Sequence, residues 1–464
     1  MDSPYPGNEN IQEDHKEKDW ESSADELTGC GASLLCNPHR APHRFVVLIF
    51  ICLLSFGSYF CYDNPGPLQT YIKEDMDVNT SQYMLLYSVY SYPNMILCFF
   101  GGFLIDRVFG IRLGAIIFTA FVMSGQVVFA MGAFINHYWL MCVGRFIFGI
   151  GGESLAVSQN TYAVSWFKDK ELNMVFGLQL SVSRVGSVVN FNTMVAVYDW
   201  LSNAHRGHKY LGYALLFACL LCVLSFVCSL LLSFFDRRAE RILNRQAGKT
   251  GEVIQFRDIK DFSLSFWLIS IICVTYYVTI FPFIGLSNEF FVRKYSLTLD
   301  EANVCSSLVY TISAVASPLL GFCIDRVGRN LMWAIFAIIL TLLSHGSLAF
   351  TSLNPYAVMS VMGISYSMLA SSLWPMVTYV IPEHQLGTAY GIMQSIQNCG
   401  LGIVSQVSGI IVDGSGYLLL EVFNLACLCL ALIATVLLWV TDDGRGRLLN
   451  LSRAERIRQR NELE

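Results

Sequence analysis

Charged residues are scarce in this chain. Aspartate, glutamate, lysine and arginine together make up 14% of its 464 residues, whereas hydrophobic residues make up 54%. Soluble globular domains carry about 25% charged residues. The scarcity of charge therefore excludes an ordinary soluble protein, and it predicts that most of the chain lies in a lipid bilayer.

Other features are missing as well. The first 43 residues have no apolar segment of the kind that a secretory signal peptide needs. The sequence shows no nucleophile paired with a base, no metal-ligand cluster and no phosphate-binding loop, so we expect no enzyme activity, no cofactor and no nucleic-acid partner. Most of the 15 cysteines fall within apolar stretches, where we interpret them as small buried hydrophobes rather than disulfide partners.

Long apolar stretches dominate what is present. A helix of about 20 apolar residues crosses a hydrocarbon core of ~30 Å. Twelve stretches meet this requirement: 44–63, 82–105, 112–134, 138–164, 173–197, 211–235, 263–287, 301–324, 331–352, 355–381, 386–412 and 416–440. The predicted fold class is therefore an all-α membrane protein with 12 transmembrane helices.

The connections predict how these spans are grouped. The longest one, 236–262, is basic and separates two sets of six spans. We predict a disordered tail (1–43), an N-terminal six-helix bundle (44–235), a linker (236–262), a C-terminal six-helix bundle (263–441) and a second tail (442–464). Loops on the side of the linker hold more lysine and arginine than the opposite loops, so the positive-inside rule puts both termini in the cytosol.

A short motif occurs twice. Gly102-Phe-Leu-Ile-Asp-Arg-Val returns as Gly321-Phe-Cys-Ile-Asp-Arg-Val, each time where an apolar stretch ends and a basic turn begins. A signature repeated at half the chain length, among a dozen apolar stretches, is typical of a duplicated carrier with six spans per half.

The first copy, extended to Gly110 and Arg112, is similar to the loop signature of the major facilitator superfamily. Gly144-Arg145-Phe-Ile-Phe-Gly149 resembles the fourth-span motif of the same superfamily. Asp106 can pair with an arginine or a helix N-terminus of the other half, and such a pair would latch one conformation. The resemblance implies gating roles for this set of residues: Asp106, Arg107, Arg112, Arg145, Asp325 and Arg326. For Arg145, eight residues before Glu153, two interpretations stay open: it balances that carboxylate, or it serves the structural motif.

Three further runs, Phe56–Pro65, Gly149–Tyr162 and Pro382–Asn398, resemble a narrower group of lysosomal dipeptide carriers within the superfamily. The likeness covers about 44–440. It implies uniport of dipeptides across the lysosomal membrane and a glycosylated accessory membrane protein that protects the carrier from lysosomal proteases. The tail contains Leu34-Leu35, a dileucine that lacks the acid of the usual sorting pattern, so the lysosomal address rests on the resemblance. Asn79-Thr-Ser81 is the only glycosylation pattern on the non-cytosolic side.

Charges within predicted spans are costly and usually functional. Glu153 is about 15 residues from Lys168 and about 16 from His137, so it lies near the bilayer midplane. Arg184, in the next span, lies at a similar depth. We hypothesise that Glu153 binds the ammonium group of a dipeptide and that Arg184 binds its carboxylate. The alternative is an internal ion pair between the two.

Aromatic and amide residues are candidates for the walls of a cavity between the halves. The substrate-binding set comprises Glu153, Arg184, Tyr59, Tyr62, Tyr276, Trp374 and Asn398, with Tyr87, Tyr90, Tyr277 and Gln394 as further candidates. For each aromatic residue taken singly, packing or a place in the interfacial belt is an equally good interpretation. His345 is interpreted as a packing residue.

The first span has no charge before Asp63, and Glu153 is the one acid predicted at the midplane. The fifth span lacks the Gly-Pro pair typical of antiporters in this superfamily. These absences favour facilitated diffusion. Two other functions stay open: a carrier of another small solute, such as an organic anion or a sugar, and a nutrient sensor that uses a carrier fold without transport.

Overall fold

A computed structural model describes residues 37–38, 41–167, 172–203, 205–243, 258–382, 385–444, 447–452, 455 and 458. The dileucine Leu34-Leu35 and the loop residue Lys168 lie outside this part. The helices follow one another as α2 (Ala41–Leu54), α3 (Phe56–Tyr62), α4 (Gln69–Asp75), α5 (Thr80–Phe103), the π-helix η2 (Leu104–Phe109), α6 (Gly110–Phe134), α7 (Tyr138–Phe167), α8 (Leu172–Ser202), α9 (His208–Leu243), the 3-10 helix η3 (Asp258–Asp261), α10 (Leu264–Tyr295), α11 (Leu299–Val327), α12 (Asn330–Phe350), α13 (Pro355–Val380), α14 (Leu386–Ser415) and α15 (Tyr417–Asp443).

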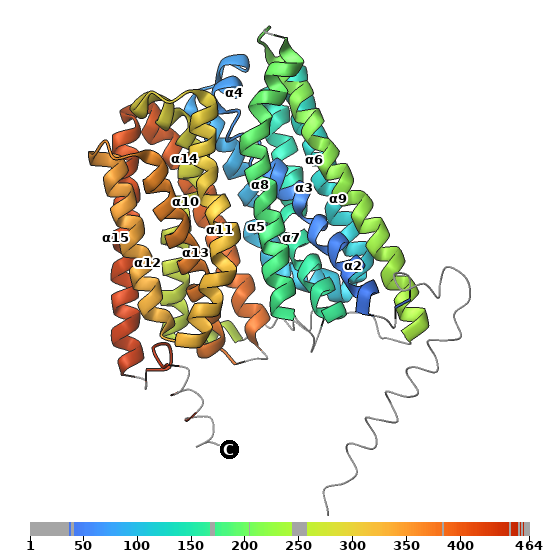
Figure 1. The fold of residues 1–464 in the computed structure, drawn as a ribbon, viewed down its shortest axis with the longest axis vertical. Coiled ribbons are helices and arrows are strands. Elements are labelled where there is room, and N and C mark those ends of the chain that lie inside the picture. The colour runs from blue at the N-terminus through green and yellow to red at the C-terminus, as the bar shows by residue number, and fades with distance from the viewer. Residues whose placement is uncertain are drawn as a thin grey trace, which may run out of the picture.

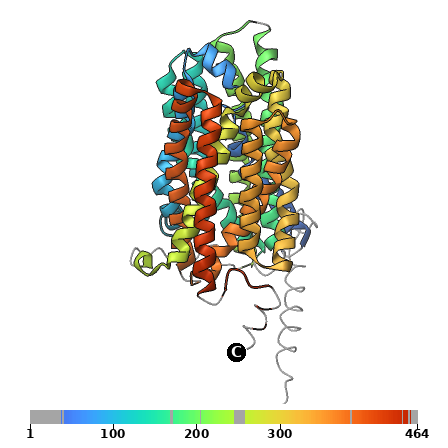
Figure 2. The same cartoon turned by 90° about the vertical axis from the view of Figure 1, so that its left-hand side faces the viewer.

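The long helices run side by side in two groups, with α2–α9 in one group and α10–α15 in the other (Figure 1). The view from the side shows the same parallel arrangement for α12 and α15 (Figure 2). The buried hydrophobic residues form two clusters, one centred on each group. The all-α fold is thus built as two helical bundles, each with its own apolar core.

Ten helices of the described part are long and apolar enough to cross a membrane, with α2 and α3 counted together as one. Each of the 12 predicted stretches overlaps a helix, but α5 and α8 fall outside the ten. These two helices make the most extensive contacts between the bundles, α5 with α14 and α8 with α11. Helices that face a polar interior carry fewer apolar residues, so hydropathy alone underestimates them. The count of 12 spans stays a prediction.

Within the N-terminal bundle, α6 and α7 cross in close contact because glycines face each other. A Cβ atom on Gly125 would lie 2.3 Å from the backbone nitrogen of Phe148, and one on Gly144 would lie 2.3 Å from that of Phe129. Small residues at a crossing let two membrane helices approach closely. Such close packing favours their association in lipid, where no hydrophobic force drives helices together. This contact holds α7, the helix that carries Glu153.

Three features depart from the predicted segments. The first predicted span is broken between α2 and α3, and a buried turn from Asp63 to Leu68 leads into α4, a short helix that the sequence did not predict. The first copy of the repeated motif runs from the end of α5 into the π-helix η2, whereas the second lies at the end of the regular helix α11. Helix α9 continues to Leu243, inside the segment predicted as a linker.

Candidate functional site

A cavity of about 250 Å³ lies between the two bundles. Helices α3, α5, α7 and α8 line it from one side, and α10, α11, α13 and α14 line it from the other. A second space of about 450 Å³ shares Tyr59, Glu153 and Trp374 with it and extends past Gln159 towards Val164 and the end of α7. The cavity therefore continues towards the face on which α7 ends and α8 begins.

Arg184 reaches across the gap between the bundles from α8. Its Nη2 atom donates a hydrogen bond to the hydroxyl of Tyr366 on α13, and the guanidinium carbon lies 4.9 Å from the centre of that ring. Tyr310 of α11 presents a second ring at 5.7 Å. Aromatic faces stabilise a cation where water is scarce. The cavity thus contains a guanidinium fork whose geometry suits a carboxylate.

Two carboxylates face the same space. Glu153 on α7 accepts a hydrogen bond of 3.2 Å from Nε2 of Gln394 on α14. Asp63, in the turn after α3, is buried and accepts a hydrogen bond of 3.1 Å from the hydroxyl of Tyr310. Glu153 was predicted to be the one acid at the midplane, and Asp63 is a second acid at the same cavity that the sequence analysis did not place there. The charged groups all belong to the N-terminal bundle, and each bonds to a neutral group of the C-terminal bundle.

The structure places most of the predicted binding residues around this cavity: Glu153, Arg184, Tyr59, Tyr62, Trp374 and Asn398 line it. Among the ion pairs of the described residues, Glu153 and Arg184 are not partners, so the alternative of an internal pair finds no support. Asn398 is held in place by a 3.0 Å hydrogen bond from its side chain to the carbonyl of Gln394. The roles of these six lining residues in binding stay predictions.

Tyr276 was predicted to bind the substrate, but it does not line the cavity. Its side chain is fully buried in the C-terminal bundle, where its hydroxyl lies 2.9 Å from Oγ1 of Thr341. The neighbouring Tyr277 lines the cavity instead and accepts a hydrogen bond of 3.1 Å from the indole of Trp374. Adjacent residues on a helix point about 100° apart, and here Tyr277 is the one that faces the cavity.

Sequence reasoning missed other residues of the lining, among them the polar residues Asp63, Tyr310, Tyr366 and Gln397. A signal that the helix ends at Asp63 was present, because Asp63-Asn-Pro-Gly66 is a turn sequence. The two tyrosines gave no such signal, since nothing in an apolar helix marks which face turns inward.

Arg145 has a structural environment. It is fully buried, and its guanidinium donates hydrogen bonds to the backbone carbonyls of Cys61 at 3.2 Å, Tyr62 at 3.0 Å and Leu86 at 3.3 Å. The rings of Tyr62, Tyr87, Tyr90, Phe129 and Phe148 surround it at 5.3 to 5.7 Å. Its charge compensates the carbonyls at the end of α3, which favours the structural interpretation over pairing with Glu153.

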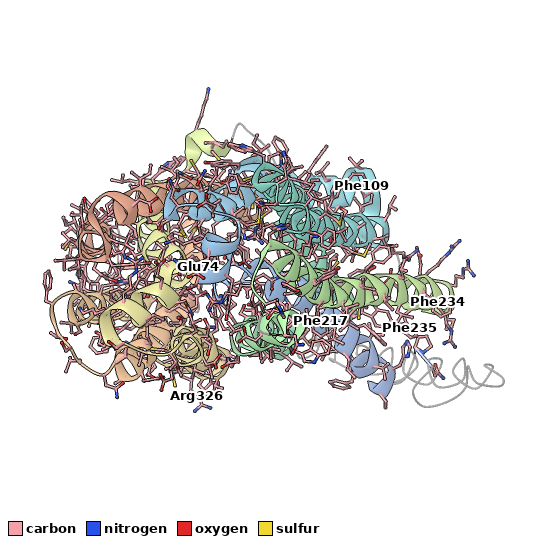
Figure 3. The ribbon with its side chains drawn as sticks, turned by 90° about the horizontal axis from the view of Figure 1, so that it is seen from above. Glu74, Phe109, Phe217, Phe234, Phe235 and Arg326 are labelled. Carbon is pink, nitrogen blue, oxygen red and sulfur yellow. The ribbon has the colours of Figure 1, made fainter. Side chains whose placement is uncertain are left out.

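The other predicted gating residues lie on the face where the C-terminus lies. Arg112 at the start of α6 bonds to Asp236 at 2.7 Å and to Glu240, both near the end of α9. Asp325 and Arg326 are exposed at the end of α11, and Figure 3 labels Arg326. The guanidinium carbon of Arg326 lies 4.5 Å from the centre of the Phe322 ring. The side chains of Asp106 and Arg107 lie outside the described part, so the latch predicted for them stays a prediction.

The opposite face, where α4 lies in Figure 1, is closed by contacts between the bundles. Glu289 of α10 pairs with Lys73 of α4 at 2.8 Å and accepts a hydrogen bond of 3.1 Å from Gln69. Asp413 of α14 accepts hydrogen bonds from the backbone nitrogens of Thr80, at 3.0 Å, and Ser81, at 2.6 Å, at the first turn of α5. We call this set the α4 latch: Gln69, Lys73, Thr80, Ser81, Glu289 and Asp413.

His345 lies away from the cavity. Its Nδ1 is 2.7 Å from Oε2 of Glu421, and both side chains are buried between α12 and α15. The ring of Phe283 packs against the imidazole at 5.1 Å. This environment agrees with the interpretation of His345 as a packing residue.

Comparisons with known proteins place the chain in a family. Residues 51–290 and 268–461 match the Major Facilitator Superfamily, and the chain belongs to this superfamily. It is 58% identical to the "Lysosomal dipeptide transporter MFSD1" of Danio rerio, over 95% of this chain and 96% of the relative. It is 57% identical to the protein of the same name from Homo sapiens, over 93% of this chain and 92% of the relative. Among solved structures, a crystal structure of the nucleoside transporter NupG matches with a TM-score of 0.65 at 14% identity, over 85% of this chain and 99% of that chain, which supports the fold alone.

Proposed function

We propose that this chain is a 12-span carrier of the lysosomal membrane, with both termini in the cytosol, that moves dipeptides of varied side chains by alternating access and facilitated diffusion. The relatives described as lysosomal dipeptide transporters support the substrate class and the membrane. The observation that carries the proposal is the arrangement of opposite charges around one cavity, with Glu153 and Arg184 on neighbouring helices.

In this mechanism the two ends of the substrate are read by charge. The carboxylate of the dipeptide replaces the Tyr366 hydroxyl as the acceptor of Arg184, and the guanidinium fork gives it two parallel hydrogen bonds. The ammonium group replaces Gln394 as the donor to Glu153. The rings of Tyr59 and Trp374 bound the space left for side chains. Because only the ends are read by charge, many dipeptides fit. Two carboxylates beside one guanidinium disfavour an organic dianion as the substrate.

Alternating access then follows from the contacts between the bundles. In the structure the α4 latch is closed, and the cavity continues towards the opposite face. Rocking the bundles about the cavity would open the α4 latch and close the other face, where Arg112 and the second copy of the motif lie. On this proposal the latch faces the lysosomal lumen and the opposite face is cytosolic.

A glycosylated accessory membrane protein is part of the proposal. The Asn79 side chain caps α5 by accepting a hydrogen bond of 2.7 Å from the backbone nitrogen of Gln82. The glycosylation pattern Asn79-Thr-Ser81 is therefore folded into the first turn of a helix at the α4 latch. A carrier whose single luminal pattern is used in this way depends on another protein for its carbohydrate shield.

The proposed binding of the two charged ends by Glu153 and Arg184 is tested by a thermodynamic cycle. It combines variants that lack one charge with dipeptides in which one end is blocked. Purified carrier in proteoliposomes takes up a labelled dipeptide, its N-acetylated form and its C-terminal amide. Losing one charge-assisted hydrogen bond costs about 1.5–3 kcal/mol, so we expect each block to lower the affinity of the wild type roughly 10- to 150-fold. Glu153→Gln should bind the free and the acetylated dipeptide equally, and Arg184→Gln should bind the free dipeptide and the amide equally.

Glu74→Gln is the matched control, because Glu74 is an exposed acid outside the cavity. If Glu153→Gln and Arg184→Gln transport as the wild type does, the proposed recognition of the two charged ends is wrong. Uniport needs a separate test, since Asp63 is a second acid at the cavity and a second acid is a candidate proton carrier. Accumulation of a dipeptide above its equilibrium level under an imposed proton gradient would refute facilitated diffusion and leave dipeptide recognition intact.

A further inference from the structure

The last three turns of α9 carry a basic face that lies outside the central cavity. Phe234, Arg237, Arg238 and Arg241 are spaced three, four and seven residues apart, so they form one stripe along the helix. Asp236 and Glu240 occupy the other side, where they bond to Arg112 of α6. The arginine stripe therefore points away from the N-terminal bundle. Figure 3 shows α9 running outward, with Phe234 near its far end.

The stripe has a cationic part and an apolar part. In the part of the chain that the structure describes, Arg237, Arg238 and Arg241 form no ion pair and donate no hydrogen bond to a side chain. Together with Phe234 and Ile242 they line a hollow of about 300 Å³. Phe234 is 63% exposed, although it is among the most apolar of side chains. An exposed ring beside three guanidinium groups at the end of a membrane helix matches the boundary between acyl chains and head groups.

We propose that this stripe binds the head group of a phosphoinositide, a phospholipid whose inositol ring carries phosphate monoesters. The guanidinium forks of Arg237, Arg238 and Arg241 donate to the phosphate oxygens, and the Phe234 ring lies among the acyl chains. The location in the cytosolic leaflet rests on the topology given under the proposed function. The lipid itself is argued from the stripe alone.

The chemistry favours a lipid phosphate over the other anions available at a helix end. A soluble anion would contact the arginines and leave the exposed Phe234 ring without a partner. Phosphatidylcholine has no net charge, and its own quaternary ammonium group lies beside its phosphate. The positive-inside rule explains an excess of cations at cytosolic helix ends. It does not explain why three arginines share one stripe beside a hollow. A phosphate monoester on a lipid satisfies both halves of the stripe.

The test measures lipid binding directly on the full-length purified carrier, with no transport step. The probe is dioctanoyl phosphatidylinositol 4-phosphate, with dioctanoyl phosphatidylcholine as the neutral comparison, and bound lipid is counted by native mass spectrometry. The first variant is Arg237→Gln/Arg238→Gln/Arg241→Gln. The matched control is Lys260→Gln/Arg326→Gln/Arg329→Gln, which removes the same charge from exposed positions on the same face. Phe234→Ser separates the acyl contact from the head-group contact.

We expect the wild type and the control to bind the phosphoinositide equally, and the arginine variant to bind it at least tenfold more weakly. Phe234→Ser should weaken binding of the lipid and leave binding of free inositol phosphate unchanged. Equal losses in the arginine variant and the control would overturn the proposal, because binding would then follow total charge. Unchanged binding in the arginine variant, or free inositol phosphate bound as tightly as the lipid, would also overturn it. Stabilisation by dipeptide, measured on the same samples, reports the central cavity separately.

Discussion

The pair of Lys73 and Glu289 in the α4 latch predicts how firmly one face of the carrier is held shut. The pair joins the two bundles, and its side chains are only 18% and 12% exposed. Glu289→Gln removes the charge that Lys73 needs and keeps an oxygen that can accept the hydrogen bonds from Gln69 and the Tyr417 hydroxyl. The variant therefore isolates the charge from the rest of the contact.

The magnitude follows from the partners of Glu289. A hydrogen bond to a charged group is worth about 1.5–3 kcal/mol net, and we take the lower end because some hydrogen bonding survives. The nearby Arg293 is 63% exposed, so its contact with Glu289 contributes little. A loss of about 1.5 kcal/mol shifts the balance between the closed and open latch roughly tenfold towards the open form.

Pulsed electron paramagnetic resonance measures this shift. Spin-label amino acids at Asp77, in the N-terminal bundle, and Leu353, between α12 and α13, report the distance across the latched face, and both positions are exposed. We expect Glu289→Gln to add a population at longer distance. Glu74→Gln is the control, because Glu74 pairs with Arg206 at 2.6 Å on the same face but within one bundle. A distance distribution for Glu289→Gln that coincides with those of the wild type and the control would refute the reasoning.

Three further predictions concern stability, each measured by thermal unfolding of the purified carrier. Arg145→Met leaves buried carbonyls without a donor and should cost at least about 2 kcal/mol, and a variant as stable as the wild type would contradict this role. Gly144→Ala puts a Cβ against the backbone of α6 and should cost about 1–3 kcal/mol, whereas Gly346→Ala, where a Cβ meets nothing within 4 Å, should be neutral or stabilising. Burial raises the pKa of Asp75 on α4, opposed by the hydrogen bond from the Tyr198 hydroxyl, so the folded state gains stability from this group as the pH falls through that raised pKa. Asp75→Asn should lose this part of the gain between pH 7 and pH 4, and an identical pH profile for the variant would count against it.

The sequence predicted the fold and the charged centre of the cavity for one physical reason. In long apolar stretches a charge is conspicuous, so Glu153 and Arg184 were singled out, and both line the cavity between the bundles. The face of each helix that turns towards the cavity could not be predicted, because apolar residues occur on all sides of a membrane helix. Tyr276 was therefore placed in the binding set and Tyr277, which faces the cavity, was only a further candidate, while Tyr310 and Tyr366 were missed.

Asp63 was missed for a different reason. The length of the apolar stretch put it at the end of a span, whereas the chain turns inside the protein after α3 and continues into α4. Hydropathy measures length along the chain and does not show where a helix stops short. The α4 latch follows from the same turn, so it could not be predicted from the spans.

The bonds that the three cavity charges make across the gap have a kinetic consequence. In the structure, Arg184, Glu153 and Asp63 each form a hydrogen bond with a residue of the other bundle. The empty carrier must break these ties to reorient, whereas a bound dipeptide supplies replacement partners to two of the three charges. The loaded carrier should therefore cross its barrier faster than the empty one. Dipeptide on the far side of the membrane should then accelerate the flux of labelled dipeptide from the near side, a trans-stimulation that an open channel cannot show.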